Sequence, residues 1–131
     1  MAGQGLLSLF IVEDDVNFRE TFIDAMGLKG IAVRAAGSGL EGLAALRDHT
    51  PHVIVLDVQL PDIHGFDLCK MIRRIDSLRK VPILFVSASA QYSDPRDRVD
   101  GILAGASGFL PKPITPDKLL SEIESLLPAN S

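Results

Sequence analysis

The chain has 131 residues, 47% of them hydrophobic, and a formal net charge of −4 at pH 7. Length and apolar content predict one globular domain over residues 1–131, with its core at about 6–127, and exclude a disordered chain. The negative charge argues against direct nucleic-acid binding through a basic face. The single cysteine, Cys69, excludes an internal disulfide and a thiolate metal cluster.

No apolar run approaches the length of a membrane span, and residues 1–5 lack the basic start of a secretory signal. We therefore expect a cytoplasmic domain without a membrane partner. Residues 128–131 have the composition of a frayed end or of the start of a linker.

The first half of the chain alternates strand and helix patterns. Leu6–Val12 is an apolar run of strand length, followed by apolar residues at helical spacing, namely Phe18, Phe22, Ala25 and Met26. Ile31–Ala35 predicts a second strand. Ser38 and Glu41 have the spacing of a capping box, which predicts a helix with Leu40, Leu43, Ala44 and Leu46 on its inner face.

The unbroken apolar run Val53–Leu56 leads directly into Asp57. Such a run is typical of a strand that is buried on both faces of a parallel sheet. Pro61 cannot continue the strand because it has no N–H to donate. Asp57 is therefore expected at the carboxyl end of a central strand, where ligands bind in open α/β sheets.

The second half repeats the alternation. Apolar residues at helical spacing follow Gly65, and they are Leu68, Cys69, Ile72 and Ile75. Val81–Val86 predicts a strand, and Asp94-Pro95 the start of a helix that contains Gly101. Phe109-Leu110 predicts a short strand, and Thr115-Pro116 begins the last amphipathic helix. Five alternations indicate parallel strands joined by right-handed crossovers, which is a doubly wound α/β sheet with helices on both faces.

A parallel sheet brings the residues that follow its strands to one edge, and here these residues carry chemistry: Glu13, Asp14, Asp57, Ser87 and Lys112. Two carboxylates about 4 Å apart repel by roughly 4 kcal/mol at an effective dielectric constant near 20. A hard divalent cation such as Mg²⁺ would relieve this repulsion, whereas the lack of nearby His or Cys argues against zinc. A carboxylate nucleophile, a cation, a hydroxyl and a lysine together suit uptake of a phosphoryl group.

Four segments carry a resemblance to a known family: IVEDD at 11–15, VLDVQLPDIHG at 55–65, VSAS at 86–89 and GASGFLPKP at 105–113. In this order and spacing, the chain from about Leu6 to Leu127 resembles a chemotaxis-regulator-like receiver domain of the two-component response-regulator family. The resemblance implies a flavodoxin-like sheet of five strands in the order 2-1-3-4-5, with five helices.

The resemblance also implies roles for single residues. Asp57 would be the phosphoacceptor, and Mg²⁺, for which Mn²⁺ can substitute, would be bound by Asp14, Asp57 and the carbonyl of Gln59, with Glu13 acting mainly through metal-bound water. Lys112 would pair with Asp57 at rest and with a phosphoryl oxygen afterwards. Ser87 would hydrogen-bond another phosphoryl oxygen, and Phe109 would move inward as a switch. The Lys112–Pro113 peptide bond would be cis.

Three positions also have a purely structural interpretation. Phe109, at the start of a strand, could be a core residue, and Asp15 could be an exposed residue in the first turn of a helix. His64 is expected to have a surface role only. In the family, Gln59 and Ser89 stand where phosphoryl lifetime is tuned.

The function implied is a phosphorylation-controlled switch in a phosphorelay, with a sensor histidine kinase or phosphotransfer protein as donor and an output domain or effector as target. The fourth helix, fifth strand and fifth helix would form the output face, with a homodimer as one option. One alternative is a pseudo-receiver that binds partners without being phosphorylated. Another is a true phosphoaspartyl hydrolase, but Gln59 stands where that class needs a carboxylate, so the chain is not expected to turn over external substrates.

Overall fold

The computed structural model describes residues 7–88 and 95–127, and it contains one parallel sheet. Its strands are β1 (Ser8–Val12), β2 (Ala32–Ala36), β3 (Val53–Asp57), β4 (Ile83–Ser87) and β5 (Gly108–Pro111). They pair in the order β2-β1-β3-β4-β5, which confirms the predicted topology. The expected strand bounds were off by one or two residues at some ends, and Leu6 lies outside the described residues.

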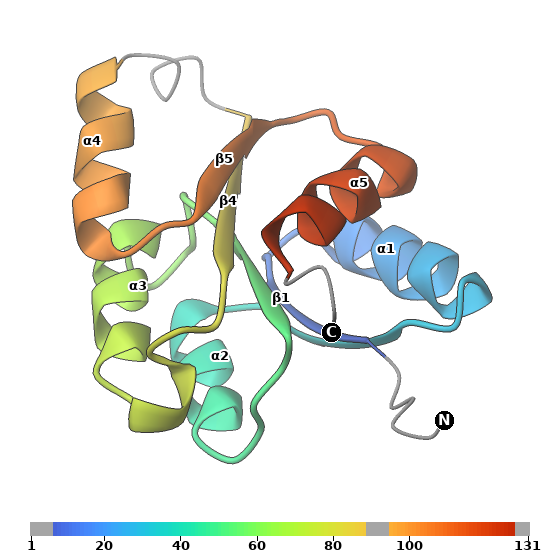
Figure 1. Ribbon diagram of the computed structural model, residues 1–131, viewed down its shortest axis with the longest axis horizontal. Coiled ribbons are helices and arrows are strands. Elements are labelled where there is room, and N and C mark those ends of the chain that lie inside the picture. The colour runs from blue at the N-terminus through green and yellow to red at the C-terminus, as the bar shows by residue number, and fades with distance from the viewer. Residues whose placement is uncertain (1–6, 89–94, 128–131) are drawn as a thin grey trace.

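The helices cover both faces of the sheet. They are α1 (Val16–Leu28), α2 (Gly39–Leu46), α3 (Gly65–Arg73), α4 (Pro95–Ala104) and α5 (Pro116–Leu126), with an unanticipated 3-10 turn, η1, at Asp76–Leu78. Figure 1 shows α1 and α5 on one side of the sheet and α2, α3 and α4 on the other. None of the helices in the described ranges has the length and hydropathy that a bilayer span requires.

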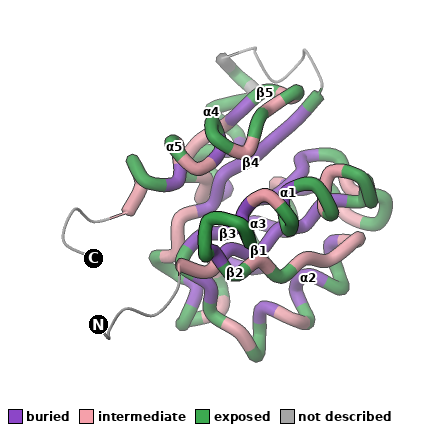
Figure 2. Tube along the Cα trace, turned by 90° about the vertical axis from the view of Figure 1, so that its right-hand side faces the viewer, coloured by how far each residue is buried: buried purple, intermediate pink, exposed green. Residues whose placement is uncertain are grey.

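Each face of the sheet has its own apolar core. On one side Leu9 and Ile11 pack with residues of α1 and α5, namely Phe22, Met26, Leu119 and Ile123. On the other side Phe10 and Val12 pack with residues of α2 and α3, namely Leu43, Leu46, Leu68 and Ile72. Every residue of β3 and β4 is buried, as the continuous apolar runs predicted, and Figure 2 shows β4 as an unbroken buried stretch. The strand that ends at Asp57 is therefore held rigidly from both sides.

The inner face predicted for α2 was partly wrong. Leu40 and Ala44 are exposed, whereas Gly39 and Gly42 are buried with Leu43 and Leu46. The reason is close packing: a Cβ on Gly42 would lie 2.7 Å from Val12 Cγ2, and a Cβ on Gly39 would lie 2.2 Å from Ile63 Cγ2. Gly42 thus faces the sheet and Gly39 faces the loop after β3, while the Leu40 side chain lies in solvent.

Helix ends largely follow the predicted signals. The Ser38 side chain accepts from the Glu41 N–H, although the Glu41 carboxylate accepts from the Ser38 hydroxyl and not from its backbone as in a full capping box. Thr115 caps α5 through the Lys118 N–H. Ile75, which was grouped with the helical residues after Gly65, lies beyond α3. The cap expected at Asp94 falls outside the described residues.

Phe109 packs between β4 and α4. Its ring stacks on Phe85 with centroids 5.4 Å apart and meets Phe66 edge-on at 6.1 Å. Gly101 of α4 is buried against it, and a Cβ there would lie 2.1 Å from Phe109 Cζ. The glycine therefore makes room for the ring, and the contact joins the middle of α4 to the sheet.

Helix propensity and packing predict opposite effects for Gly101→Ala. Propensity alone would stabilise the helix by up to about 1 kcal/mol. We expect the reverse, a loss of about 1–3 kcal/mol, because Phe109 is held by two other rings and the added methyl overpacks the core. The measurement is chemical denaturation of both variants. Gly27→Ala in α1 is the matched control: a Cβ there meets nothing within 4 Å, so this variant should be as stable as the native chain or more stable. Equal gains in both variants would contradict the packing argument.

Candidate functional site

Sheet register brings the predicted acids together. Val12 of β1 is paired with Leu56 of β3, so Glu13 follows β1 beside the position of Asp57. Carboxylate oxygens of Glu13, Asp14 and Asp57 all lie within 4.8 Å of one another. Glu13 and Asp57 are 1% and 6% exposed, whereas Asp14 is exposed. Two buried acids and one exposed acid thus form a cluster that opens to solvent through Asp14.

Lys112 supplies positive charge and forms ion pairs with two of the acids, the expected Asp57 and also Glu13. Its ammonium forms a short ion pair with Glu13 Oε1, whereas its Nζ is 3.7 Å from Asp57 Oδ2. The expected pair with Asp57 at rest is therefore the weaker of two contacts.

The environment of Glu13 opposes ionisation. Burial raises the pKa of the Glu13 carboxyl to about 7, against the lowering effects of the Lys112 hydrogen bond and the Asp15 N–H, while repulsion from Asp57 raises it further. The positive charge of Lys112 alone therefore does not offset the effect of burial on the pKa of Glu13. A cation bound by the carboxylates would favour the ionised form of all three.

The other predicted residues lie at the same edge. Ser87 ends β4, is 6% exposed, and its carbonyl accepts from the Lys112 N–H at 2.9 Å. β4 is paired with β3 so that Val86 stands opposite Asp57, which puts Ser87 one residue further along that edge. The Lys112–Pro113 peptide bond is cis, as expected. Phe109 is partly buried in the ring cluster, so its described contacts are those of a core residue; Ser89 lies outside the described residues.

The loop between β3 and α3 is fixed by hydrogen bonds that local sequence patterns did not reveal. The Gln59 N–H donates to Asp57 Oδ1 at 3.1 Å. Asp62 accepts from the N–H groups of Gly39 and Leu40, both at 2.9 Å, and these bonds lower the pKa of its carboxyl. Asp62 thus binds the N-terminus of α2 across more than twenty residues of sequence, a contact without a sequence signal.

The roles expected for His64 and Asp15 need correction. His64 is exposed, as expected, but it is more than a surface residue because its Nδ1 accepts from the Phe66 N–H and caps α3. Asp15 precedes α1 and is its N-cap, accepting from Asn17 and Phe18. Arg19, which the sequence analysis did not single out, donates to the Glu13 carbonyl at 2.8 Å and holds the backbone of the acids.

The family model of the response regulator receiver domain matches residues 9–124. The chain belongs to this family. Receivers are parts of two-component response regulators, and the phosphorylation-controlled signalling expected from the motifs is consistent with that membership.

Two curated relatives of this receiver are named as transcriptional regulatory proteins. GltR of Pseudomonas aeruginosa and AfsQ1 of Streptomyces coelicolor are each 38% identical over 120 residues, which is 92% of this chain but 48% and 51% of theirs. The receiver therefore spans about half the length of these relatives. Among solved structures, the chemotaxis response regulator CheY4 of Vibrio cholerae is similar with a TM-score of 0.86 and 28% identity, over 93% of this chain and 99% of that one.

Receivers bind Mg²⁺ at such an acidic cluster, and the donors here fit it. Carboxylate oxygens are the ligands that Mg²⁺ prefers, and the described cluster of Glu13, Asp14 and Asp57 contains no softer donor. Asp14 is exposed, so a cation at the cluster would have one side toward solvent, which suits Mg²⁺ because it usually keeps several of its waters.

Mg²⁺ at millimolar concentration should raise the melting temperature of the receiver. A cation that binds only the folded cluster stabilises it by mass action and removes repulsion between carboxylates. The measurement is a thermal melt over a Mg²⁺ titration, with Asp14→Asn to weaken binding. Asp24→Asn removes one charge outside the cluster and is the control for net charge. Melting curves that do not change with Mg²⁺ would contradict the site.

Proposed function

We propose that the chain is a signalling switch in which Asp57 accepts a phosphoryl group from the phosphohistidine of a sensor histidine kinase or phosphotransfer protein. The position of Asp57 carries the proposal. Its carboxylate stands at the end of the rigid central strand, beside two further acids, with the Lys112 ammonium at 3.7 Å. Such a group is a nucleophile in a setting that can neutralise incoming phosphate charge.

The transfer makes one bond and breaks one bond. A carboxylate oxygen of Asp57 attacks phosphorus, the P–N bond to the donor imidazole breaks, and its electron pair stays on the imidazole nitrogen. The product is an acyl phosphate on Asp57. A Mg²⁺ ion held by Asp14, Asp57 and the Gln59 carbonyl, with Glu13 through a water, would supply positive charge to the phosphoryl oxygens.

Two side chains of this edge would bind the new group. Lys112 would exchange its ion pairs for a phosphoryl oxygen, and Ser87 would donate a hydrogen bond to another. Loss of phosphate would follow from attack of water on phosphorus, which breaks the P–O bond to Asp57, restores the carboxylate and releases inorganic phosphate. Gln59 stands two residues after Asp57, where a hydrolase would need a carboxylate, so the domain would catalyse only its own phosphorylation and dephosphorylation.

The output would travel through α4. Movement of Ser87 toward phosphate would open space for Phe109, whose ring lies against Gly101 in α4. Val99, Ile102 and Leu103 of α4 are exposed large apolar residues, which suits a helix that meets an output domain, an effector or a second copy of the chain. The transcriptional regulators that resemble this chain are about twice its length, which supports an output domain beyond the receiver.

A phosphoryl adduct on Asp57 is the direct test. Brief exposure to a small acyl phosphate with Mg²⁺, followed by acid quench and intact mass measurement, should give one added phosphoryl group. Asp57→Ala and a chelator should each abolish it. Asp67→Ala, which removes an exposed carboxylate ten residues further along the chain, is the control and should still be modified. If no adduct forms and beryllofluoride also fails to bind, the chain is a pseudo-receiver.

Ser87→Ala should separate chemistry from switching. The variant should still accept phosphate, because Asp57, the metal ligands and Lys112 remain. It should lose the response of α4, because no hydroxyl draws the end of β4 toward the phosphate. Amide chemical shifts with and without beryllofluoride give the measurement, and Ser87→Thr is the conservative control that should respond. Shift changes in α4 of Ser87→Ala equal to those of the native chain would refute the role of Ser87.

A further inference from the structure

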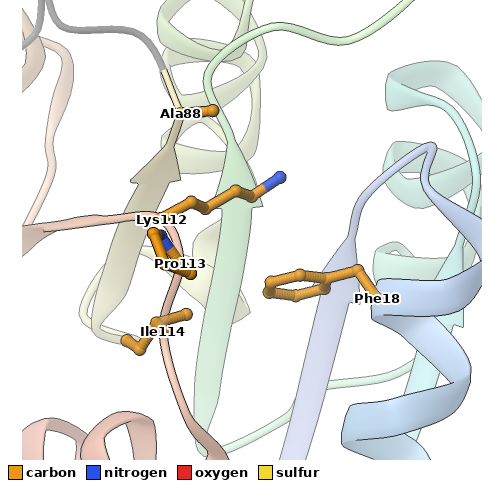
Figure 3. A pocket seen from close by; sticks show the side chains of 5 residues that line it. All are labelled: Phe18, Ala88, Lys112, Pro113 and Ile114. Carbon is orange, nitrogen blue, oxygen red and sulfur yellow. The ribbon is translucent and has the colours of Figure 1, made fainter.

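The Lys112 ammonium lies over an aromatic face as well as beside the acids. Its Nζ is 4.8 Å from the centroid of the Phe18 ring. The two residues line a hollow of about 310 Å³ together with Ala88, Pro113 and Ile114. Figure 3 shows the Lys112 side chain extending across this hollow and the Phe18 ring projecting into it from α1. The lysine is thus bounded by carboxylates and by an aromatic ring.

The ring itself is held in place. Phe18 stacks on Phe22 with centroids 4.3 Å apart, and Phe22 is buried in the core. The Phe18 N–H donates to the Asp15 cap at 3.3 Å, so the first turn of α1 fixes the backbone. The segment that supplies Glu13 and Asp14 therefore also supplies a fixed ring.

At its other end Lys112 is anchored only through its backbone. Its N–H donates to the Ser87 carbonyl, and a flexible four-carbon stem separates that anchor from the ammonium. The side chain is 18% exposed and borders an open hollow, so a rotamer directed to solvent would be the alternative to the observed one at the acids. Attraction between the ammonium and the π-face would favour the observed rotamer.

We propose that Phe18 is a positioning residue for Lys112: its ring keeps the ammonium at the acid cluster, ready to bind a phosphoryl oxygen. The proposal rests on the function proposed above. It differs from a packing role because an aliphatic side chain of similar size would fill the space but not attract the cation. It also differs from a metal-binding role because Phe18 offers no ligand atom.

The test compares Phe18→Leu with Phe18→Trp, which keeps an aromatic face. Phe18→Leu should slow phosphorylation by a small acyl phosphate roughly two- to fivefold, the range of a partly exposed cation–π contact, whereas Phe18→Trp should react at a rate close to native. Mg²⁺ affinity should be unchanged in both. A small donor is used so that kinase docking plays no part. Ile23→Leu, on the same helix, is the control for a general effect of α1.

Two further readouts separate positioning from structure. In a Lys112→Met background, Phe18→Leu should have no added effect on the rate. In the unmodified protein, the Lys112 Cε–Hε resonance should carry an upfield ring-current shift that Phe18→Leu removes. A native rate in Phe18→Leu, an undiminished effect without Lys112, or an unchanged resonance would each overturn the proposal. Absence of Asp57 phosphorylation in the native chain would instead overturn the proposed function, while the resonance would still report on the Phe18–Lys112 contact.

Discussion

Electrostatic repulsion at one edge of the sheet is the constraint on which the rest of the site depends. Glu13 and Asp57 are buried side by side, where a pair of charges about 4 Å apart repels by roughly 4 kcal/mol even at an effective dielectric constant of 20. Lys112 offsets part of this, but the pKa of Glu13 stays raised to about 7 by burial. Carboxylates held in this arrangement favour the binding of a cation. A bound metal ion and the Lys112 ammonium would both compensate the negative charge of these carboxylates.

The elements around the acid cluster are rigid, so the carboxylates stay in place for a cation. β3 is buried along its whole length, the two cores clamp it from both faces, and Asp62 binds the loop after it to the start of α2. The acids therefore cannot relax apart to lower their repulsion. Two groups from other strands lie at the same edge: Lys112, which follows β5 and carries its ammonium on a flexible four-carbon stem, and Ser87, which ends β4. A new negative charge on Asp57 would act on these two groups, and the contact of Phe109 with Gly101 joins β5 to α4.

Sequence patterns predicted the sheet well because its strands are continuous apolar runs that end in polar residues. The strand order came from the family resemblance. The placement of Glu13, Asp14, Asp57, Ser87 and Lys112 at one edge came from the rule that parallel strands end on the same side. Patterns failed where tertiary packing decided: the face of α2 is set by glycines that approach Val12 and Ile63, which hydrophobic periodicity reads as gaps. The Asp62 cap and the preference of Lys112 for Glu13 are long-range contacts that no local window contains.

Phe18 has two kinds of contact, with the core and with a charged residue of the site, and only the first could be predicted from the sequence pattern. Its periodic position marks it as part of the inner face of α1, and its stacking on Phe22 agrees with that. The same ring also meets the ammonium of a lysine ninety-four positions away, which periodicity does not detect. Because α1 begins directly after Glu13 and Asp14, the geometry of that junction sets both the carboxylates and the ring. Glu13 and Phe18, which both contact Lys112, are thus placed by the residues that join β1 to the first turn of α1. A change in that junction would alter both contacts together.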